Sequence, residues 1–98
     1  SHYAPRTRMT LQPLASFTPE QQNQLGALVF RQPVGSIPRA NQIILSPAGD
    51  LAEAARNLFS ALRALDALNV SLVWTELVPE EGLGRAINDR LRRAAHSA

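Results

Sequence analysis

A short apolar run followed by a turn and a long amphipathic stretch constrains the fold of this chain more than any other feature. Residues 43–45 (Ile-Ile-Leu) are consecutively apolar, which is typical of a strand buried on both faces of a parallel sheet. A turn follows at residues 46–49, and Asp50 with Glu53 then forms a helix-start signal. The apolar side chains of the predicted helix share one stripe: Leu51, Ala54, Ala55, Leu58, Leu62 and Leu65. Because residues 70–77 are rich in β-branched and aromatic side chains, we expect a strand-helix-strand unit to be completed there.

The first third of the sequence contains further signals for strands and for a helix. Residues 9–14 are predicted to form a short strand. Thr18 and Gln21 form a capping box at the start of a short helix, and Gly26 is expected to end that helix. Residues 27–30 then favour a second strand.

The remaining segments complete an alternating pattern. Residues 31–40 are rich in proline and glycine and are predicted to form a loop. Asn69 is expected to end the long helix in the left-handed conformation, and a last helix is predicted at about residues 83–95. Its inward positions are expected to be Leu83, Ile87, Leu91 and Ala94. The predicted fold class is α/β: a three-layer, Rossmann-like domain with a mostly parallel sheet of about four strands and helices on its faces.

A chain of 98 residues allows one compact domain. We expect residues 9–98 to form a single α/β domain and residues 1–8 to form an extended segment, because Pro5 disfavours helix at the residue before it. No apolar run approaches the length of a membrane span. The cysteine-free chain is expected to reside in the cytoplasm.

The charge set excludes several kinds of chemistry. All ten basic residues are arginine, against eight carboxylates, for a formal net charge of +2. Without lysine the chain can form no Schiff base and has no phosphate-loop lysine. Without cysteine it has no thiolate nucleophile and no zinc-thiolate site.

Two weak motifs favour structural interpretations. Gly82-Leu83-Gly84 lies between a predicted strand and helix, where a dinucleotide fingerprint would lie. The third glycine of that fingerprint is absent, and the neighbouring acidic residues would repel a phosphate, so Gly82 and Gly84 are predicted to serve a tight turn. His2 and His96 lie near opposite chain ends. We therefore expect neither a catalytic residue nor a metal site in this chain.

The last predicted helix is locally basic. Arg85, Arg92 and Arg93 gather on one side of it with Asp89, which predicts a solvated face with cations toward the helix C-terminus. The alternative interpretation is a phosphate-contacting patch for nucleic acid, although no aromatic residues are interleaved for base stacking.

Two charges interrupt the apolar stripes. Arg90 lies toward the inward side of the last helix, and Asp66 lies at the edge of the long helix's stripe. An unpaired buried charge is costly. We therefore predict that Arg90 meets a carboxylate within the protein, with Asp66 as the first candidate.

Several longer motifs resemble one family. They are residues 2–7 (His-Tyr-Ala-Pro-Arg-Thr), 46–50 (Ser-Pro-Ala-Gly-Asp), 55–59 (Ala-Arg-Asn-Leu-Phe), 62–66 (Leu-Arg-Ala-Leu-Asp) and 81–95, which begins Glu-Gly-Leu-Gly-Arg-Ala-Ile-Asn. Together they resemble the C-terminal accessory domain of the long-form L-threonylcarbamoyladenylate synthases. In that family a YrdC-like catalytic domain precedes a linker that contains the His-Tyr-Ala-Pro motif.

The resemblance implies a function for the parent protein. The parent would convert ATP, threonine and bicarbonate to threonylcarbamoyl-AMP and pyrophosphate, for threonylcarbamoyladenosine modification of tRNA. ATP and Mg would be bound by the catalytic domain, and no cofactor is implied for this domain. His2, Tyr3, Pro5 and Arg6 would be lid or interdomain contacts, and Asp66 and Arg90 would be structural or interdomain residues. The domain would anchor the linker that closes the neighbouring active site.

Two other classes of function stay open. In one, the arginine-bearing last helix contacts tRNA through Arg85, Arg92 and Arg93, which predicts an affinity that falls steeply with salt. In the other, the domain is a dimerisation module or a docking module for the downstream tRNA threonylcarbamoyl transferase, which predicts an exposed apolar patch. The implied partner in every case is the YrdC-like catalytic domain of the same chain.

Overall fold

The computed structural model describes residues 6–96 and shows a four-stranded, wholly parallel sheet with strand order β1-β4-β2-β3. The strands are β1 (Arg8–Thr10), β2 (Gly26–Val29), β3 (Gln42–Ile44) and β4 (Leu72–Thr75). The helices are α1 (Pro19–Gln22), α2 (Leu51–Leu65) and α3 (Leu83–His96), with short 3-10 turns η1 (Leu14–Ser16) and η2 (Arg39–Asn41). The predicted fold class, α/β with a parallel sheet of about four strands and helices, is confirmed.

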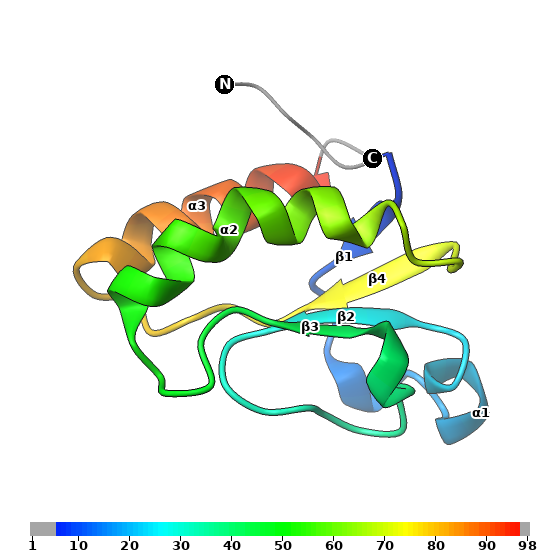
Figure 1. Ribbon diagram of the computed structural model, residues 1–98. Coiled ribbons are helices and arrows are strands. Elements are labelled where there is room, and N and C mark those ends of the chain that lie inside the picture. The colour runs from blue at the N-terminus through cyan, green and yellow to red at the C-terminus, as the bar shows by residue number, and fades with distance from the viewer. Residues whose placement is uncertain (1–5, 97–98) are drawn as a thin grey trace.

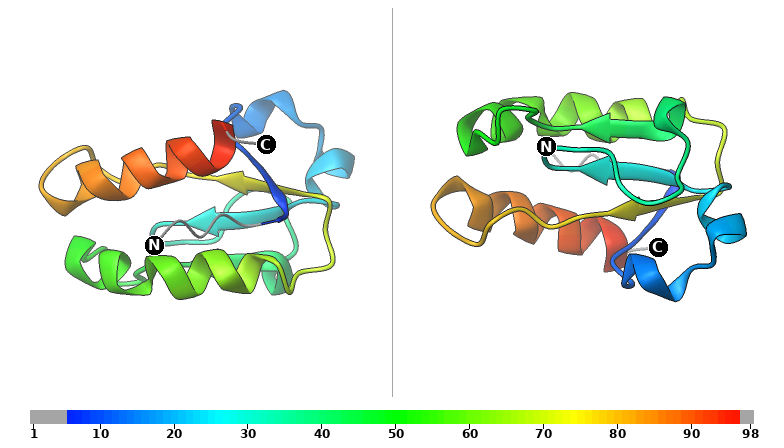
Figure 2. Two further views of the ribbon diagram at one scale, coloured as in Figure 1. Left: turned by 90° about the horizontal axis from the view of Figure 1, so that it is seen from above. Right: turned by 90° about the horizontal axis from the view of Figure 1, so that it is seen from below.

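The strand order explains how the layers form. The connections from β1 to β2 and from β2 to β3 cross the sheet in one direction, and the connection from β3 to β4 crosses it in the other. Because parallel crossovers are right-handed, reversing the direction moves the connection to the opposite face. The connection through α2 therefore lies on one face, and η1, α1 and the loop before β3 lie on the other (Figures 1 and 2). The last helix, α3, belongs to no crossover and packs beside α2 on the same face. We call the α2–α3 side the helical face.

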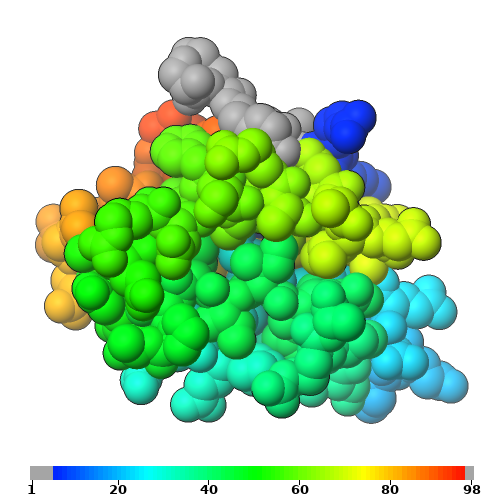
Figure 3. Space-filling model, in the orientation of Figure 1, coloured from blue at the N-terminus to red at the C-terminus, as the bar shows by residue number. Residues whose placement is uncertain are grey.

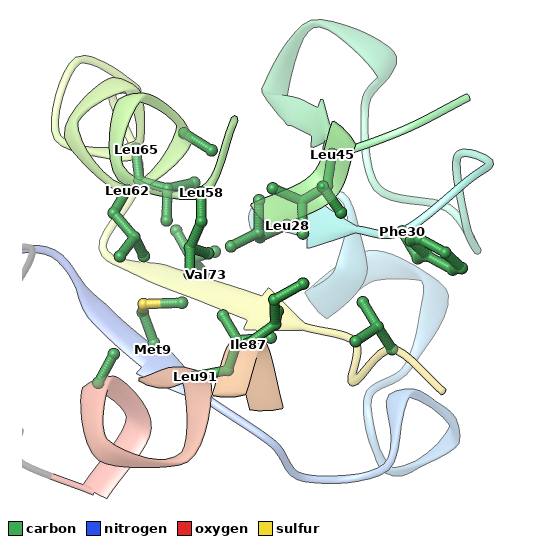
Figure 4. Packing of buried hydrophobic residues seen from close by; sticks show 14 residues of the cluster. Met9, Leu28, Phe30, Leu45, Leu58, Leu62, Leu65, Val73, Ile87 and Leu91 are labelled. Atoms are coloured by element: carbon green, nitrogen blue, oxygen red, sulfur yellow. The ribbon is translucent and has the colours of Figure 1, made fainter. Parts of the chain in front are cut away.

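A hydrophobic core fills each side of the sheet. The larger one lies between the sheet and the helical face (Figure 4), and its largest fully buried side chains are Leu28, Leu45, Leu62, Leu65, Val73 and Leu91. The smaller one lies under α1 and the loops and is formed by Leu25, Ala27, Val29 and Ile37. Ala27 and Leu28 of β2 are both fully buried and belong to different cores. This is the pattern that a strand covered on both faces requires.

Local signals set the start of α1, whereas tertiary packing sets the path of the chain after it. The Thr18 hydroxyl accepts the Gln21 backbone N–H at 3.1 Å, and the Gln21 side-chain carbonyl accepts the Thr18 N–H at 2.8 Å. The predicted capping box is confirmed. The prediction that Gly26 ends the helix is wrong, because α1 ends at Gln22 and Gly26 opens β2. A Cβ at Gly26 would lie 3.1 Å from Val70 Cγ2, so the glycine allows close packing between neighbouring segments.

The long helix α2 begins as predicted and ends differently. The Asp50 carboxylate caps it by accepting the Ala52 N–H at 2.9 Å. Glu53 makes a different contact from a capping box, because its carboxylate accepts the Ser46 hydroxyl at 2.5 Å. The helix ends at Leu65 with Asp66 as its C-cap in a right-handed conformation. No non-glycine residue within 6–96 has a positive φ, so the prediction of a left-handed Asn69 is wrong.

The inward side of α3 is also largely as predicted. Ile87, Leu91 and Ala94 are buried in the larger core. Leu83 was predicted to face inward and is instead 52% exposed, because it lies in the first turn, where α3 extends past the strands. Within residues 6–96 no helix combines the length and the apolar character needed to cross a bilayer.

Candidate functional site: the anchor of the N-terminal segment

The chain enters the domain beside the C-terminal end of α2 (Figure 1). The backbone N–H of Thr7 donates a hydrogen bond of 3.0 Å to Asp66 Oδ1. Asp66 is the C-cap of α2, and its own N–H bonds to the carbonyl oxygens of Arg63 and Ala64. The carboxylate is therefore held at a helix end and takes its donor from a segment 59 positions away in the sequence.

The strand that follows Thr7 is fixed on both sides. β1 pairs with β4 in parallel, with Met9 opposite Val73, and the Met9 side chain is buried in the larger core. Beyond the strand, the Trp74 indole N–H donates to the Gln12 carbonyl at 2.7 Å. We call Thr7, Met9, Gln12 and their partners Asp66 and Trp74 the linker anchor. Together these contacts fix residues 7–12 against α2 and β4.

The surface around the anchor is polar. Arg6, Thr7, Arg8, Asp66, Val70 and Ser71 line an open depression of about 390 Å³ there. Arg6 and Arg8 are exposed, and Asp66 is half-buried. Two arginines, one aspartate and two hydroxyl residues, Thr7 and Ser71, line the depression together. The other predicted lid residues, His2, Tyr3 and Pro5, lie outside the described residues.

The predicted ion pair between Asp66 and Arg90 is absent. The two ion pairs found within residues 6–96 are Arg92–Glu80 and Arg93–Asp89. The Arg90 guanidinium instead lies over the Phe59 ring, with 5.8 Å from Cζ to the ring centroid. The prediction failed because a helical wheel shows which face a residue occupies but not which residue lies opposite. Nothing in the sequence pointed to Thr7 as the donor to Asp66, since a backbone N–H leaves no sequence signature.

The glycines before α3 form a tight turn. Gly82 has φ 51°, a conformation that suits glycine. A Cβ at Gly84 would lie 1.9 Å from the Pro79 carbonyl oxygen, so no larger residue fits. The backbone closes on itself here, because the Gly84 N–H bonds to the Glu81 carbonyl at 2.8 Å. The carboxylates of Glu80 and Glu81, which precede this turn directly, disfavour a phosphate here.

A buried amide holds the same turn to α3. Asn88 is 1% exposed, and its side chain accepts the Val78 N–H at 2.8 Å and donates to the Val78 carbonyl at 2.7 Å. It also donates to Glu80 Oε1, which Arg92 contacts at 3.0 Å. The hydrogen bond from Asn88, and then the one from Arg92, lower the pKa of Glu80 below its ordinary value. Sequence reasoning missed Asn88, although a lone asparagine between apolar positions of a helix is a usable signal.

The arginines of α3 are exposed, and two of them face carboxylates. Arg92 pairs with Glu80, and Arg93 pairs with Asp89 one turn earlier. These side chains are 49% and 68% exposed, so the pairs add little stability. Arg85 is exposed as well. The partnered carboxylates reduce the positive field that this helix offers to a phosphate.

Groups typical of metal or acid–base sites do not gather in the described part of the chain. No three His, Asp or Glu side chains between residues 6 and 96 lie close enough to hold a metal ion. His96 is exposed at the end of α3 and lines an open depression of about 600 Å³ with Arg8 and Arg92. His2 lies outside the described residues.

Fold and site together define a Rossmann-like α/β domain whose first strand lies between a hydrogen bond to Asp66 and one from Trp74. The family model described as "Threonylcarbamoyl-AMP synthase, C-terminal domain" matches residues 1–96. The chain therefore belongs to the family of threonylcarbamoyl-AMP synthase C-terminal domains.

Two relatives are consistent with this assignment. A threonylcarbamoyl-AMP synthase of Pyrococcus abyssi (strain GE5 / Orsay) is 51% identical over 43 residues, which is 44% of this chain and 13% of that protein. The crystal structure of P. abyssi Sua5 complexed with L-threonine matches with a TM-score of 0.70 and 29% identity, over 96% of this chain and 29% of that one. The chain thus spans less than a third of the length of the relatives it matches.

Proposed function

We propose that this domain is the accessory domain of an L-threonylcarbamoyladenylate synthase and that it anchors the linker that closes the catalytic domain's active site. The observation that carries the proposal is the linker anchor, in which Asp66 holds the Thr7 N–H and β1 is paired into the sheet. The family match supports the parent activity, namely formation of threonylcarbamoyl-AMP from ATP, threonine and bicarbonate for tRNA modification.

Closure of the active site would protect a reaction intermediate from water. Threonylcarbamoyl-AMP is a mixed anhydride of a carbamate and a phosphate, and water attacks such a bond. A segment that covers the active site excludes water while the intermediate forms. The segment can do so reproducibly only if its far end is fixed. β1 provides that fixed end, because Met9 is buried and hydrogen bonds from Thr7 and Trp74 hold either side of the strand.

In this proposal the domain itself acts by positioning the linker. ATP and Mg would be bound by the YrdC-like catalytic domain of the same chain, as the family resemblance implies. Arg6 is exposed beside the anchor and is assigned to contact that catalytic domain or the closed linker. His2, Tyr3 and Pro5 are assigned to the lid through the motif they form.

The alternative of tRNA binding through α3 has weaker support. Arg92 and Arg93 face carboxylates, and within residues 6–96 the one tryptophan, Trp74, donates its indole N–H to the protein backbone. A domain that binds RNA by this helix would show a steep loss of affinity with salt.

Removing the domain tests the proposal. The synthase is compared with a variant that ends after residue 8 and so keeps the linker. We expect similar pyrophosphate release but a lower yield of intact threonylcarbamoyl-AMP and more free AMP in the truncated protein. An unchanged yield of threonylcarbamoyl-AMP with an unchanged amount of AMP would rule out the anchoring role. A full-length protein that cannot form the adenylate would rule out the proposed activity of the parent.

A further inference from the structure

The helical face carries an apolar groove that the function above does not use. It lies between α2 and α3, has a volume of about 250 Å³, and is lined by Ala55, Leu58, Phe59, Leu83, Ala86, Ile87 and Arg90. Phe59 is 44% exposed and Leu83 is 52% exposed. We call this the α2–α3 groove. In the space-filling view the surface of α2 (green) lies beside the first turns of α3 (orange) (Figure 3).

The size of the groove limits what it can hold. Sites for small ligands and cofactors usually measure roughly 300–1,000 Å³, so the α2–α3 groove is small for one. It suits one or two side chains of a protein partner. Two large apolar side chains exposed together are also unusual on a surface that faces only water.

Arg90 defines the chemistry of that partner. Its guanidinium lies over Phe59, and its Nη2 atom is inaccessible to water with no hydrogen-bond acceptor among the described residues. An unsatisfied buried cationic N–H is costly. A small rotation of the guanidinium would turn Nη2 toward an acceptor seated in the groove, and a carboxylate is the acceptor that matches a guanidinium best.

The position of the groove says where the partner comes from. Phe59 precedes Asp66 by seven residues on α2, which is about 10 Å along the helix. The groove therefore shares helix α2 with the linker anchor and lies toward the opposite end of that helix. A domain tethered at the linker anchor meets the groove at high effective concentration, so a small contact suffices.

A second copy of this chain fits the groove less well. The exposed residues of α2 include Arg56 and Arg63, and the nearest exposed carboxylate on α3, Asp89, already pairs with Arg93. Two copies meeting face to face would bring arginines together, which is unfavourable. An acidic partner surface has the complementary charge.

We propose that the α2–α3 groove docks the catalytic domain of the same chain through an apolar side chain and a neighbouring carboxylate that binds Arg90. This inference rests on the proposed function, since it takes the catalytic domain to precede the linker. The contact adds a second attachment to that of the linker anchor and so sets the orientation between the two domains.

Photo-cross-linking in the full-length synthase tests the docking. Phe59→benzoylphenylalanine places a photoreactive group in the groove, and Leu77→benzoylphenylalanine is the matched control, because Leu77 is 37% exposed and does not line the groove. We expect a cross-link from position 59 to a catalytic-domain peptide that contains Asp or Glu. Yields no higher than the control, or cross-links between two copies, would overturn the proposal.

A second pair of variants tests the carboxylate. Arg90→Met keeps an apolar side chain over Phe59 and removes the donors, whereas Arg93→Met removes an exposed arginine outside the groove. We expect Arg90→Met to lower the cross-link yield at position 59 by about thirtyfold or more, the scale for losing one partner of a desolvated charge pair. Equal yields in both variants would overturn the role of Arg90.

The outcomes separate the two proposals. If position 59 gives no specific cross-link while truncation after residue 8 still releases AMP, the groove proposal fails and the anchoring role stands. If the cross-link forms and truncation changes nothing, the docking stands and the anchoring role fails.

Discussion

The backbone N–H of Thr7 donates to the carboxylate of Asp66 across 59 positions of sequence, at 3.0 Å. The bond joins the start of the described chain to the C-terminal end of α2. A carboxylate at a helix C-terminus faces the negative end of the helix dipole, so the donor from Thr7 offsets an otherwise unfavourable placement. The linker anchor therefore depends on a tertiary contact. A hydrogen bond between residues distant in sequence compensates for a carboxylate that is unfavourable at the end of its own helix.

Replacing Asp66 is expected to lower stability moderately. Asp66→Ala removes the acceptor for the Thr7 N–H and should lower the free energy of unfolding by about 1 kcal/mol, because the lost charged hydrogen bond outweighs relief at the helix end. Asp66→Asn retains an acceptor oxygen and should change it by less than about 0.5 kcal/mol. Urea unfolding followed by circular dichroism measures both. A larger loss in the asparagine variant would contradict this explanation.

The two glycines before α3 are expected to differ in their tolerance of alanine. Gly84→Ala places a Cβ 1.9 Å from the Pro79 carbonyl oxygen, and the backbone must move, so the expected loss is on the order of 3 kcal/mol or more. At Gly82 a Cβ meets nothing within 4 Å, and only the positive φ opposes it, which costs about 1 kcal/mol. Thermal unfolding of both variants checks the order, and equal losses would refute the close contact at Gly84.

The Asn88 amide is expected to matter more than the exposed ion pairs of α3. Asn88→Ala leaves the Val78 N–H and carbonyl buried without their side-chain partner, which should cost about 3 kcal/mol. Arg93→Ala breaks an exposed pair and should cost less than about 0.5 kcal/mol. The two variants are compared by the urea concentration at the midpoint of unfolding. Similar midpoints would mean that the turn at Val78 is held by other contacts.

Glu80 is expected to make stability depend on acid pH. Hydrogen bonds from Asn88 and Arg92 hold its pKa below the ordinary 4.5, so folding favours the ionised carboxylate. Its contribution is present above pH 4.5 and is lost as the pH falls through the lowered pKa. The difference in unfolding free energy between the parent chain and Glu80→Gln should therefore shrink on acidification below pH 4.5. A difference that is constant, or that grows toward low pH, would contradict the lowered pKa.

Features that depend on residues close together in the sequence, or on the order of the elements, were predictable. The capping box at Thr18 and the Asp50 cap follow from residue type at fixed spacing. The parallel sheet follows from strands that alternate with helices. The face on which α2 lies needed the strand order, and the face of α3 needed its packing against α2 and β1; periodicity contains neither.

Features that depend on which segments meet were not predictable. Arg90 was correctly placed near the inward side of α3, but its neighbour proved to be Phe59, and Asp66 instead receives Thr7. Leu83 belongs to the apolar period of the helix and still reaches solvent, because the first turn extends beyond the sheet. In both cases the helical periodicity is read correctly from the sequence, but the neighbouring segments decide which contacts the residue makes and how exposed it is.

Asp66→Ala in the full-length synthase tests most directly whether the linker anchor keeps the neighbouring active site closed. The measurement is the fraction of consumed ATP that is recovered as intact threonylcarbamoyl-AMP and not as free AMP, with Arg63→Ala on the same helix as the matched control. We predict that hydrolytic loss to AMP rises about fivefold in Asp66→Ala, the factor for roughly 1 kcal/mol of weaker closure, and stays unchanged in the control. An Asp66→Ala protein that retains the adenylate as well as the parent would contradict the anchoring role.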